Sequence, residues 1–271
     1  VNQTIIPHAD EVGKYAWKAA KVLLGLKLDL GYVIQLSATF ALTISSYVVI
    51  TIIVGLVIGK ILATEKKSSI LVSSGTAICG GTAIACLSPT IRARPEQTAV
   101  VMALVFLLNA VALFVFPIVG EYFAMTQTQF GTWAALAIHD TSSVMATASI
   151  YGEEATAVAT TLTLCRTLWL IPLVLLFSLL EKSPEAKLRL PVFILLFMLA
   201  SVAGSTLSLS STIPHYAGAA SKILLVIALF CIGLEINRTT LKNFRGKVLV
   251  QGLLLWAIVV PVTLLISLNI A

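Results

Sequence analysis

The chain has 271 residues, of which 58% are hydrophobic and 11% are charged, with a formal net charge of +6. Soluble domains carry about a quarter charged residues, so this composition excludes a soluble enzyme or binding domain and indicates a polytopic membrane protein. Lys and Arg lie mostly in short loops beside apolar runs, which is typical of the positive-inside bias and not of nucleic-acid binding. We therefore predict an all-α fold in one integral membrane domain, residues 1–271.

Taken in chain order, an amphipathic helix is expected at Val12–Leu30 and is followed by six apolar runs. About 20 apolar residues cross a bilayer as a helix. The predicted spans are Leu36–Leu62, Ala99–Tyr122, Ala155–Leu180, Leu190–Leu207, Ala219–Ile236 and Val248–Leu268.

Two further apolar segments, Ser68–Ile91 and Phe130–Gly152, are interrupted halfway by polar or glycine residues. Basic loops, which the positive-inside rule places in the cytoplasm, flank the first segment, and acidic loops without a base flank the second. We therefore favour two re-entrant hairpins from opposite sides; two broken helices that cross fully remain the alternative. The basic loops are Lys60–Lys67, Arg92–Arg94, Lys182–Arg189 and Arg238–Lys247, and the acidic ones are Gly120–Gln129 and Tyr151–Glu154.

The interruptions predict four half-helices. Paired glycines at 80 and 81 should end a helix that begins near Ile70, and Thr82 should open a second one over Ala83–Leu87. The run Asp140–Ser143 offers good N-caps for a half-helix at Val144–Ile150. Two helix N-termini would then face the middle of the bilayer from opposite sides.

Each such N-terminus presents unpaired N–H groups and a partial positive charge, which suit an anion. Arg166, near the middle of an apolar run, adds a full charge at a depth where a lone guanidinium is costly. Hydroxyls of Thr161 and Thr163 lie nearby in the sequence. The predicted substrate-binding residues are Thr76, Cys79, Gly80, Gly81, Thr82, Thr141, Ser142, Ser143 and Arg166, and the residues predicted to couple transport to a proton or ion are His139 and Asp140.

Purely structural roles for these residues stay open. The glycines at 75, 80 and 81 can serve close helix packing alone. Asp140 can act as a helix cap that neutralises Arg166, and His139 can be a hydrogen-bonded core residue. A Cys-His-Asp enzyme would use Cys79 or Cys165 with His139, but no spacing supports it, so neither an enzyme nor a metal or other cofactor is predicted.

A short internal similarity between Leu24–Asp29 and Ile232–Asn237, near opposite ends of two predicted helices, favours an inverted repeat. Four motifs then resemble the YeiH-type family of bacterial inner-membrane proteins, a family described as sulfate exporters. They are Gly75–Ala85, Ile138–Thr141, Tyr151–Ala155 and Arg166 followed by Pro172.

The resemblance implies a multi-pass inner-membrane transporter with inverted repeats, similar to bile-acid/sodium symporters and cation/proton antiporters. It also implies further helices before Val1, and a Lys where this chain has Thr163. We expect a secondary transporter for a small oxyanion, sulfate or an organosulfonate. The alternative is a sodium- or proton-coupled cation carrier that uses Asp140. The lipid bilayer is the expected surrounding, and a homo-oligomer stays open.

Overall fold

The computed structural model describes residues 30–181 and 246–270 continuously, and isolated positions within 15–26 and 196–227. The chain divides into two compact units, residues 1–39 with 190–237 and residues 40–189 with 238–271. The second unit contains both interrupted segments. The prediction of a single domain stays a prediction, as does the inverted repeat. The predictions for residues 12–29, 182–245 and the internal similarity fall largely outside the described residues.

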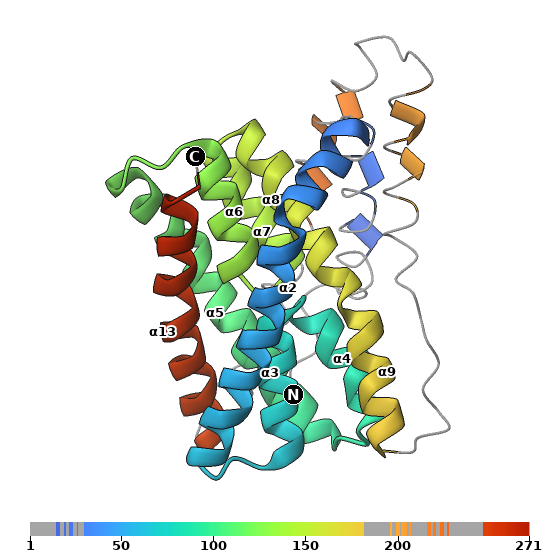
Figure 1. The fold of residues 1–271 in the computed structure, drawn as a ribbon, viewed down its shortest axis with the longest axis vertical. Helices are drawn as coiled ribbons and strands as arrows, with labels where there is room; N and C mark the ends of the chain where they lie inside the picture. The colour runs from blue at the N-terminus through green and yellow to red at the C-terminus, as the bar shows by residue number, and fades with distance from the viewer. Residues whose placement is uncertain are drawn as a thin grey trace. The chain divides into compact units, whose positions relative to one another are not determined.

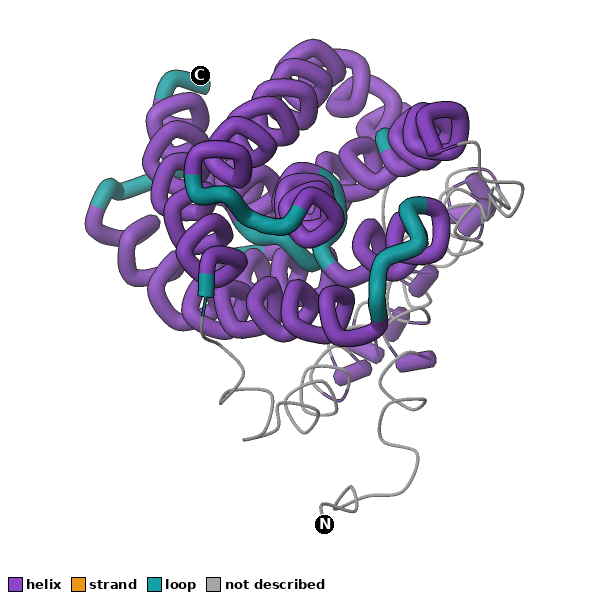
Figure 2. Tube along the Cα trace, turned by 90° about the horizontal axis from the view of Figure 1, so that it is seen from below, coloured by secondary structure: helices purple, strands orange, loops and turns teal. Residues whose placement is uncertain are grey.

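Every described element is a helix (Figures 1 and 2). Four of them, counting α8 with α9, are long and apolar enough to cross a membrane, over Ile34–Ile61, Pro95–Tyr122, Glu153–Leu180 and Lys247–Leu268. These four confirm the corresponding predicted spans and the all-helical membrane fold. The helices are α2 (Leu30–Ile61), α3 (Lys66–Ala77), α4 (Gly81–Thr90), α5 (Pro95–Tyr122), α6 (Gln127–Ala137), α7 (Thr141–Tyr151), α8 (Glu153–Leu168), α9 (Leu170–Glu181) and α13 (Lys247–Leu268).

The third span differs from the prediction of one continuous helix, because a one-residue turn at Trp169 separates α8 from α9. Pro172 lies three residues further on and has no N–H to donate to the carbonyl of Leu168. The chain turns more tightly here, and the N–H of Trp169 donates to the carbonyl oxygen of Arg166 at 3.1 Å.

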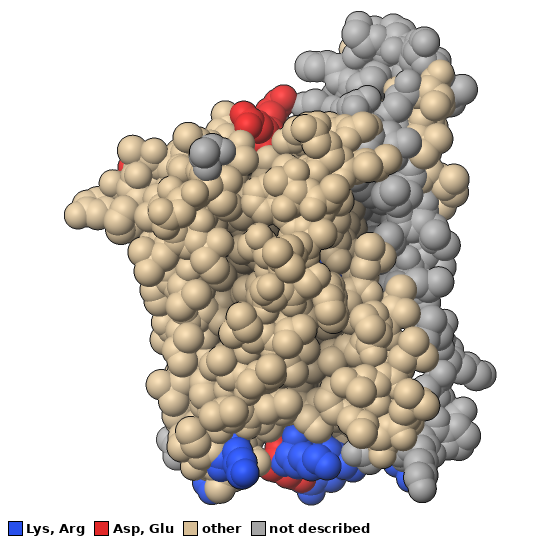
Figure 3. Space-filling model, viewed as in Figure 1, with Lys and Arg blue, Asp and Glu red and all other residues tan. Residues whose placement is uncertain are grey.

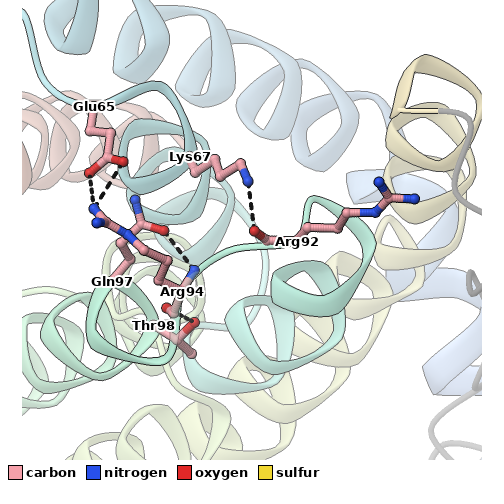
Figure 4. A network of polar contacts seen from close by, with 6 residues as sticks. All are labelled: Glu65, Lys67, Arg92, Arg94, Gln97 and Thr98. Carbon is pink, nitrogen blue, oxygen red and sulfur yellow. Dashed lines mark hydrogen bonds and ion pairs between the residues drawn. The ribbon is translucent and has the colours of Figure 1, made fainter.

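The first interrupted segment is a hairpin, α3–α4, whose two ends meet (Figure 4). Lys67 Nζ donates to the carbonyl oxygen of Arg92 at 2.6 Å. Arg94, just after the segment, forms an ion pair with Glu65, just before it, at 3.0 Å. The segment therefore returns to the side from which it starts, which confirms the re-entrant prediction and excludes a full crossing.

The second interrupted segment, α6–α7, is also a hairpin with joined ends. The Thr126 hydroxyl and the Gln129 side chain form a capping box that starts α6. Across the two ends, Thr128 Oγ1 donates to Glu154 Oε1 at 2.6 Å. Gln127 Oε1 accepts from the N–H of Glu154 at 3.0 Å.

The two hairpins enter from opposite ends of α5. The first hairpin closes just before α5 begins at Pro95, and the second opens just after α5 ends at Tyr122. A helix of 28 residues is about 42 Å long, which is enough to separate the two ends by a bilayer. Figure 3 shows Lys and Arg gathered at the lower end of the view, where acidic side chains also lie, whereas the upper end shows acidic side chains without Lys or Arg.

Small residues let α2 approach the first hairpin closely. A Cβ on Gly59 would lie 1.9 Å from Ser69 Oγ, and a Cβ on Gly55 would lie 2.4 Å from Ser73 Oγ. The buried side chain of Gln251, on α13, donates to Ser69 Oγ and to the carbonyl oxygen of Gly55, both at 2.9 Å. Close approach with interhelical hydrogen bonds is how membrane helices associate, so the first hairpin is fixed to two spans.

Candidate functional site

The tips of the two hairpins touch. The first tip is the break between Ala77 and Gly81, and the second is the break between Ala137 and Thr141. A Cβ on Gly80 would lie 3.3 Å from the carbonyl carbon and oxygen of His139. Gly80 also has φ +55, a conformation that side chains disfavour. Glycine is therefore strongly favoured at position 80, both by its backbone conformation and by the neighbouring tip.

The contact lies at mid-depth, as the spans beside it show. The side chain of Asn109, at the centre of the span Pro95–Tyr122, accepts a hydrogen bond from the N–H of His139 at 3.1 Å. Arg166 lies at the centre of the span Glu153–Leu180 and also contacts this tip. Irregular backbone at such a depth is tolerated only where protein or a wet cavity surrounds it.

Arg166 is fully buried and holds the carbonyl end of α6. Its Nη1 donates to the carbonyl oxygen of Leu136 at 3.0 Å. Its Nη2 donates to those of Ile138 at 2.9 Å and His139 at 3.2 Å. The guanidinium thus provides the donors that the last carbonyls of a helix lack, and its charge opposes the negative end of the helix dipole.

Two more mid-span side chains hold the tips and were not among the predicted site residues. Tyr47, at the centre of Ile34–Ile61, donates its hydroxyl hydrogen to the carbonyl oxygen of Thr76 at 3.3 Å. Trp256 Nε1, close to the centre of α13, donates to the carbonyl oxygen of Ala137 at 3.3 Å. With Asn109 and Arg166, each of the four described spans contributes one polar side chain to a tip. In the sequence, Tyr47 and Trp256 could have been found as residues with a polar group halfway along an apolar run.

The N-terminus of α7 is capped by a carboxylate. Asp140 Oδ2 accepts from the N–H groups of Ser142 at 3.0 Å and Ser143 at 3.2 Å, and also from the Ser142 hydroxyl. The N–H of Val144 donates to the Asp140 carbonyl at 2.9 Å. The predicted cap is confirmed, and the positive end of α7 already faces a side chain that carries a negative charge when ionised.

The N-terminus of α4 is different, because no side chain caps it. The N–H groups of Thr82 and Ile84 donate to the carbonyls of Cys79 and Gly80. Those of Gly81 and Ala83 donate to no oxygen among the described residues. Gly81 and Thr82 are half-buried, whereas the other tip residues are buried. Within the described residues, this helix end therefore offers unpaired donors and an uncompensated partial positive charge.

Several buried side chains around the second tip also lack a hydrogen-bond partner within the described part of the chain. Both imidazole nitrogens of His139, Nδ2 of Asn109, Nε of Arg166 and the Thr163 hydroxyl are all enclosed and unpaired. Thr161 instead donates to the carbonyl oxygen of Ala157 at 2.9 Å. Buried polar groups are normally paired, so a cluster of unpaired ones is a place where bound solvent or a ligand is expected.

The structure thus brings the predicted site residues together in one unit. Thr76 lies in the last turn of α3, Cys79 and Gly80 lie in the break, and Gly81 and Thr82 open α4. The residues Thr141, Ser142 and Ser143 form the first turn of α7, beside His139 and Asp140, and Arg166 reaches the same tip. Their predicted roles in binding and coupling stay predictions.

Structural roles of the same residues are supported as well. A Cβ on Gly75 would lie 3.1 Å from the Ile84 side chain, and one on Gly81 would lie 3.3 Å from Phe106, so these glycines do permit close packing. Asp140 does cap a helix. Arg166 lies within electrostatic range of Asp140, but its two terminal nitrogens are hydrogen-bonded to carbonyls.

The family model described as "Conserved hypothetical protein 698" matches residues 10–252. A UPF0324 membrane protein of Bacteroides thetaiotaomicron is 42% identical over 258 residues, which cover 91% of this chain and 77% of that protein. A UPF0324 membrane protein of Photobacterium profundum is 43% identical over 245 residues, which cover 88% of this chain and 75% of that protein.

A third relative, a UPF0324 membrane protein of Geobacter sulfurreducens, is 39% identical over 254 residues, which cover 93% of this chain and 81% of that protein. The comparison with solved structures finds no match. The chain is therefore a membrane protein that belongs to the Conserved hypothetical protein 698 (UPF0324) family, the YeiH-type family that its motifs resemble.

Proposed function

We propose that the protein is a secondary transporter that moves a small oxyanion, sulfate or an organosulfonate, across the bacterial inner membrane by alternating access. One observation carries the proposal. Two hairpins from opposite ends of α5 meet at mid-depth, and at that meeting point the N-terminus of α4 has N–H donors that no described residue accepts and no side-chain cap from the described part of the chain. Such discontinuous helices at the midplane are typical of substrate sites in secondary transporters.

The charges of the four half-helix ends support an anion. Arg166 and Trp256 occupy the carbonyl end of α6, and Tyr47 contacts that of α3. Asp140 occupies the positive end of α7. The positive end of α4 is the end that no side chain compensates among the described residues. An oxyanion can accept hydrogen bonds from the free N–H groups at the N-terminus of α4 and from nearby hydroxyls such as that of Thr82.

A cation-coupled carrier is the second candidate, and Asp140 favours it. This carboxylate lies in the wall of the second tip and is 7% exposed. Its Oδ2 accepts three hydrogen bonds, whereas no described residue donates a hydrogen bond to Oδ1. Oδ1 can therefore take a proton or a sodium ion while Oδ2 keeps the cap. His139, next to Asp140, is the second group that we assign to coupling.

The test uses one backbone donor. Gly81→Pro removes the first free N–H of α4, and proline is well tolerated at the first position of a helix. Gly81→Ala is the matched control, because it adds a side chain at the same place and keeps the N–H. Binding is measured by calorimetry on purified protein with methanesulfonate, sulfate and sodium, and flux is measured in proteoliposomes with an imposed pH or sodium gradient.

We expect anion binding in the wild type and in Gly81→Ala, and a loss of at least about tenfold in Gly81→Pro, since a hydrogen bond to a charged group contributes roughly 1.5–3 kcal/mol. Equal anion affinity in the two variants would reject the site. Heat released with sodium but with neither anion would favour the cation carrier. Turnover abolished by Cys79→Ala or Cys165→Ala would instead indicate an enzyme.

A further inference from the structure

Positive charge is concentrated around the base of the first hairpin. Of the seven Lys and Arg side chains that the structure describes, six lie at this end of the molecule, and Arg166 is the seventh (Figure 3). The described acidic side chains at the same end are the two of Glu65 and Glu96. Positive charge is therefore in clear excess. The six are Lys60, Lys66, Lys67, Arg92, Arg94 and Lys247.

Two hydrogen bonds from lysine side chains join the loops at this end. Lys67 Nζ, on α3, donates to the carbonyl oxygen of Arg92, which follows α4, at 2.6 Å. Lys247 Nζ, on α13, donates to the carbonyl oxygen of Ala63, which follows α2, at 3.3 Å. The ends of α2, of the first hairpin and of α13 are thereby kept together, and with them a group of like charges that repel one another.

Three of these cations have no partner for their charge among the described residues. Glu65 compensates Arg94 at 3.0 Å, whereas the exposed charged groups of Lys60, Lys66 and Arg92 form no ion pair within the described part of the chain. Arg92 has φ +51, and Lys67 holds the carbonyl of this left-handed turn. Figure 4 shows that the guanidinium of Arg92 points away from the other labelled side chains.

These charges lie at the depth of lipid headgroups. Lys60 is the next-to-last residue of the span Ile34–Ile61. Arg94 directly precedes the span that begins at Pro95, and Lys247 is the first residue of another span. The ends of apolar spans lie where the hydrocarbon core gives way to the headgroups. Anionic lipids attract basic residues at that level.

The opposite end of the molecule lacks this character. The acidic residues Glu121, Glu153 and Glu154 lie there, without a Lys or Arg among the residues that the structure describes. In the sequence, the loops 182–189 and 238–247, which we predict on the basic side, contain seven Lys or Arg and one Glu. They add to the positive charge of that side by composition.

We propose that the base of the first hairpin binds the headgroup of an anionic phospholipid, with Lys66 and Arg92 as the cations that contact its phosphate. A guanidinium fork matches two phosphate oxygens, and an ammonium adds a second positive charge. The bound lipid compensates the excess charge and stabilises the closed base of the hairpin. This role is independent of the transported substrate.

The experiment compares two lipids that differ in headgroup charge. Thermal unfolding of the purified full chain is followed in dodecyl maltoside micelles with added dioleoylphosphatidylglycerol or dioleoylphosphatidylcholine. The rise of the unfolding midpoint with lipid concentration gives each apparent dissociation constant. We expect the anionic lipid to bind at least about fivefold more tightly, which is roughly the factor that one Lys or Arg contributes at an anionic membrane surface.

Two double variants separate charge from other effects. Lys66→Gln with Arg92→Gln removes both charges from exposed positions, and the preference for phosphatidylglycerol should fall below about twofold. Lys66→Arg with Arg92→Lys is the matched control, because it keeps both charges and should keep the preference. Circular dichroism checks that each variant is folded.

Three results would overturn the proposal. The first is equal affinity of the wild type for the two lipids. The second is a preference that the double glutamine variant retains in full. The third is inorganic phosphate that stabilises the protein as much as phosphatidylglycerol does, because the cations would then serve a soluble anion and not a lipid. None of the three bears on the transporter proposal, whose test uses anions at the hairpin tips.

Discussion

Replacing Arg166 by Met tests whether the guanidinium holds the second hairpin tip. Methionine has a similar length but no donor, so the carbonyl oxygens of Leu136, Ile138 and His139 lose the hydrogen bonds that Arg166 provides. Arg166 is completely buried, so water does not replace those donors without a rearrangement of the tip. We expect the variant to be less stable, with the tip as the part that opens first.

The expected change in the free energy of unfolding on Arg166→Met is the difference between two opposing contributions. Each buried carbonyl left without a partner costs roughly 1–3 kcal/mol, and three are affected. Removing a guanidinium from the centre of a bilayer recovers roughly 2.5–3.5 kcal/mol. The difference between the middles of these ranges is a loss of about 3 kcal/mol. Arg166→Lys should lose less, because an ammonium keeps the charge but cannot reach all three oxygens as a fork does.

The assay is reversible unfolding of the purified protein in mixed micelles, followed by far-ultraviolet circular dichroism. Arg94→Met is the matched control, since the Arg94 and Glu65 side chains are 66% and 54% exposed and a surface ion pair contributes about 0–1 kcal/mol. The reasoning is refuted if Arg166→Met lowers the free energy of unfolding by less than about 1 kcal/mol, or by no more than Arg94→Met does.

Three further predictions concern the same unit. Asp140→Ala should destabilise the protein by about 1 kcal/mol because α7 loses its cap, and Asp140→Asn by less; equal losses in the same unfolding assay would argue against the cap. Gly80→Ala should cost about 2 kcal/mol, because φ is +55 and the new Cβ meets the opposite tip at 3.3 Å, and an unchanged unfolding midpoint would contradict this geometry. Single cysteines at Lys67 and Arg92, in a background without the native cysteines, should react with an impermeant maleimide from one side of the membrane and a cysteine at Glu154 from the other. Labelling of positions 67 and 92 from different sides would show that the first segment crosses.

Local sequence determined where the helices break. Gly80 and Gly81 interrupt an apolar run, and Asp140 with the following Thr and Ser residues starts a helix, so both breaks were predictable from neighbouring residues alone. The charges at Lys66, Lys67 and Arg92 likewise predicted that the first segment returns to its own side, because the positive-inside bias acts on loops separately. Pro172 carries a local signal as well, because a proline cannot donate the hydrogen bond that an uninterrupted helix needs.

The tertiary structure alone decided what the buried polar side chains do. The sequence predicts Arg166 as a substrate-binding residue, and that role stays a prediction; the structure adds that its two terminal nitrogens donate to carbonyls 27 to 30 residues away along the chain. Trp256 reaches a carbonyl 119 residues away. Hydrogen-bond partners at such separations depend on how the hairpins pack against the spans, and composition and periodicity do not encode that packing. The positions of the helix breaks depend on neighbouring residues and can be predicted from the sequence. Which side chains compensate the partial charges at the ends of the half-helices depends on how the helices pack together.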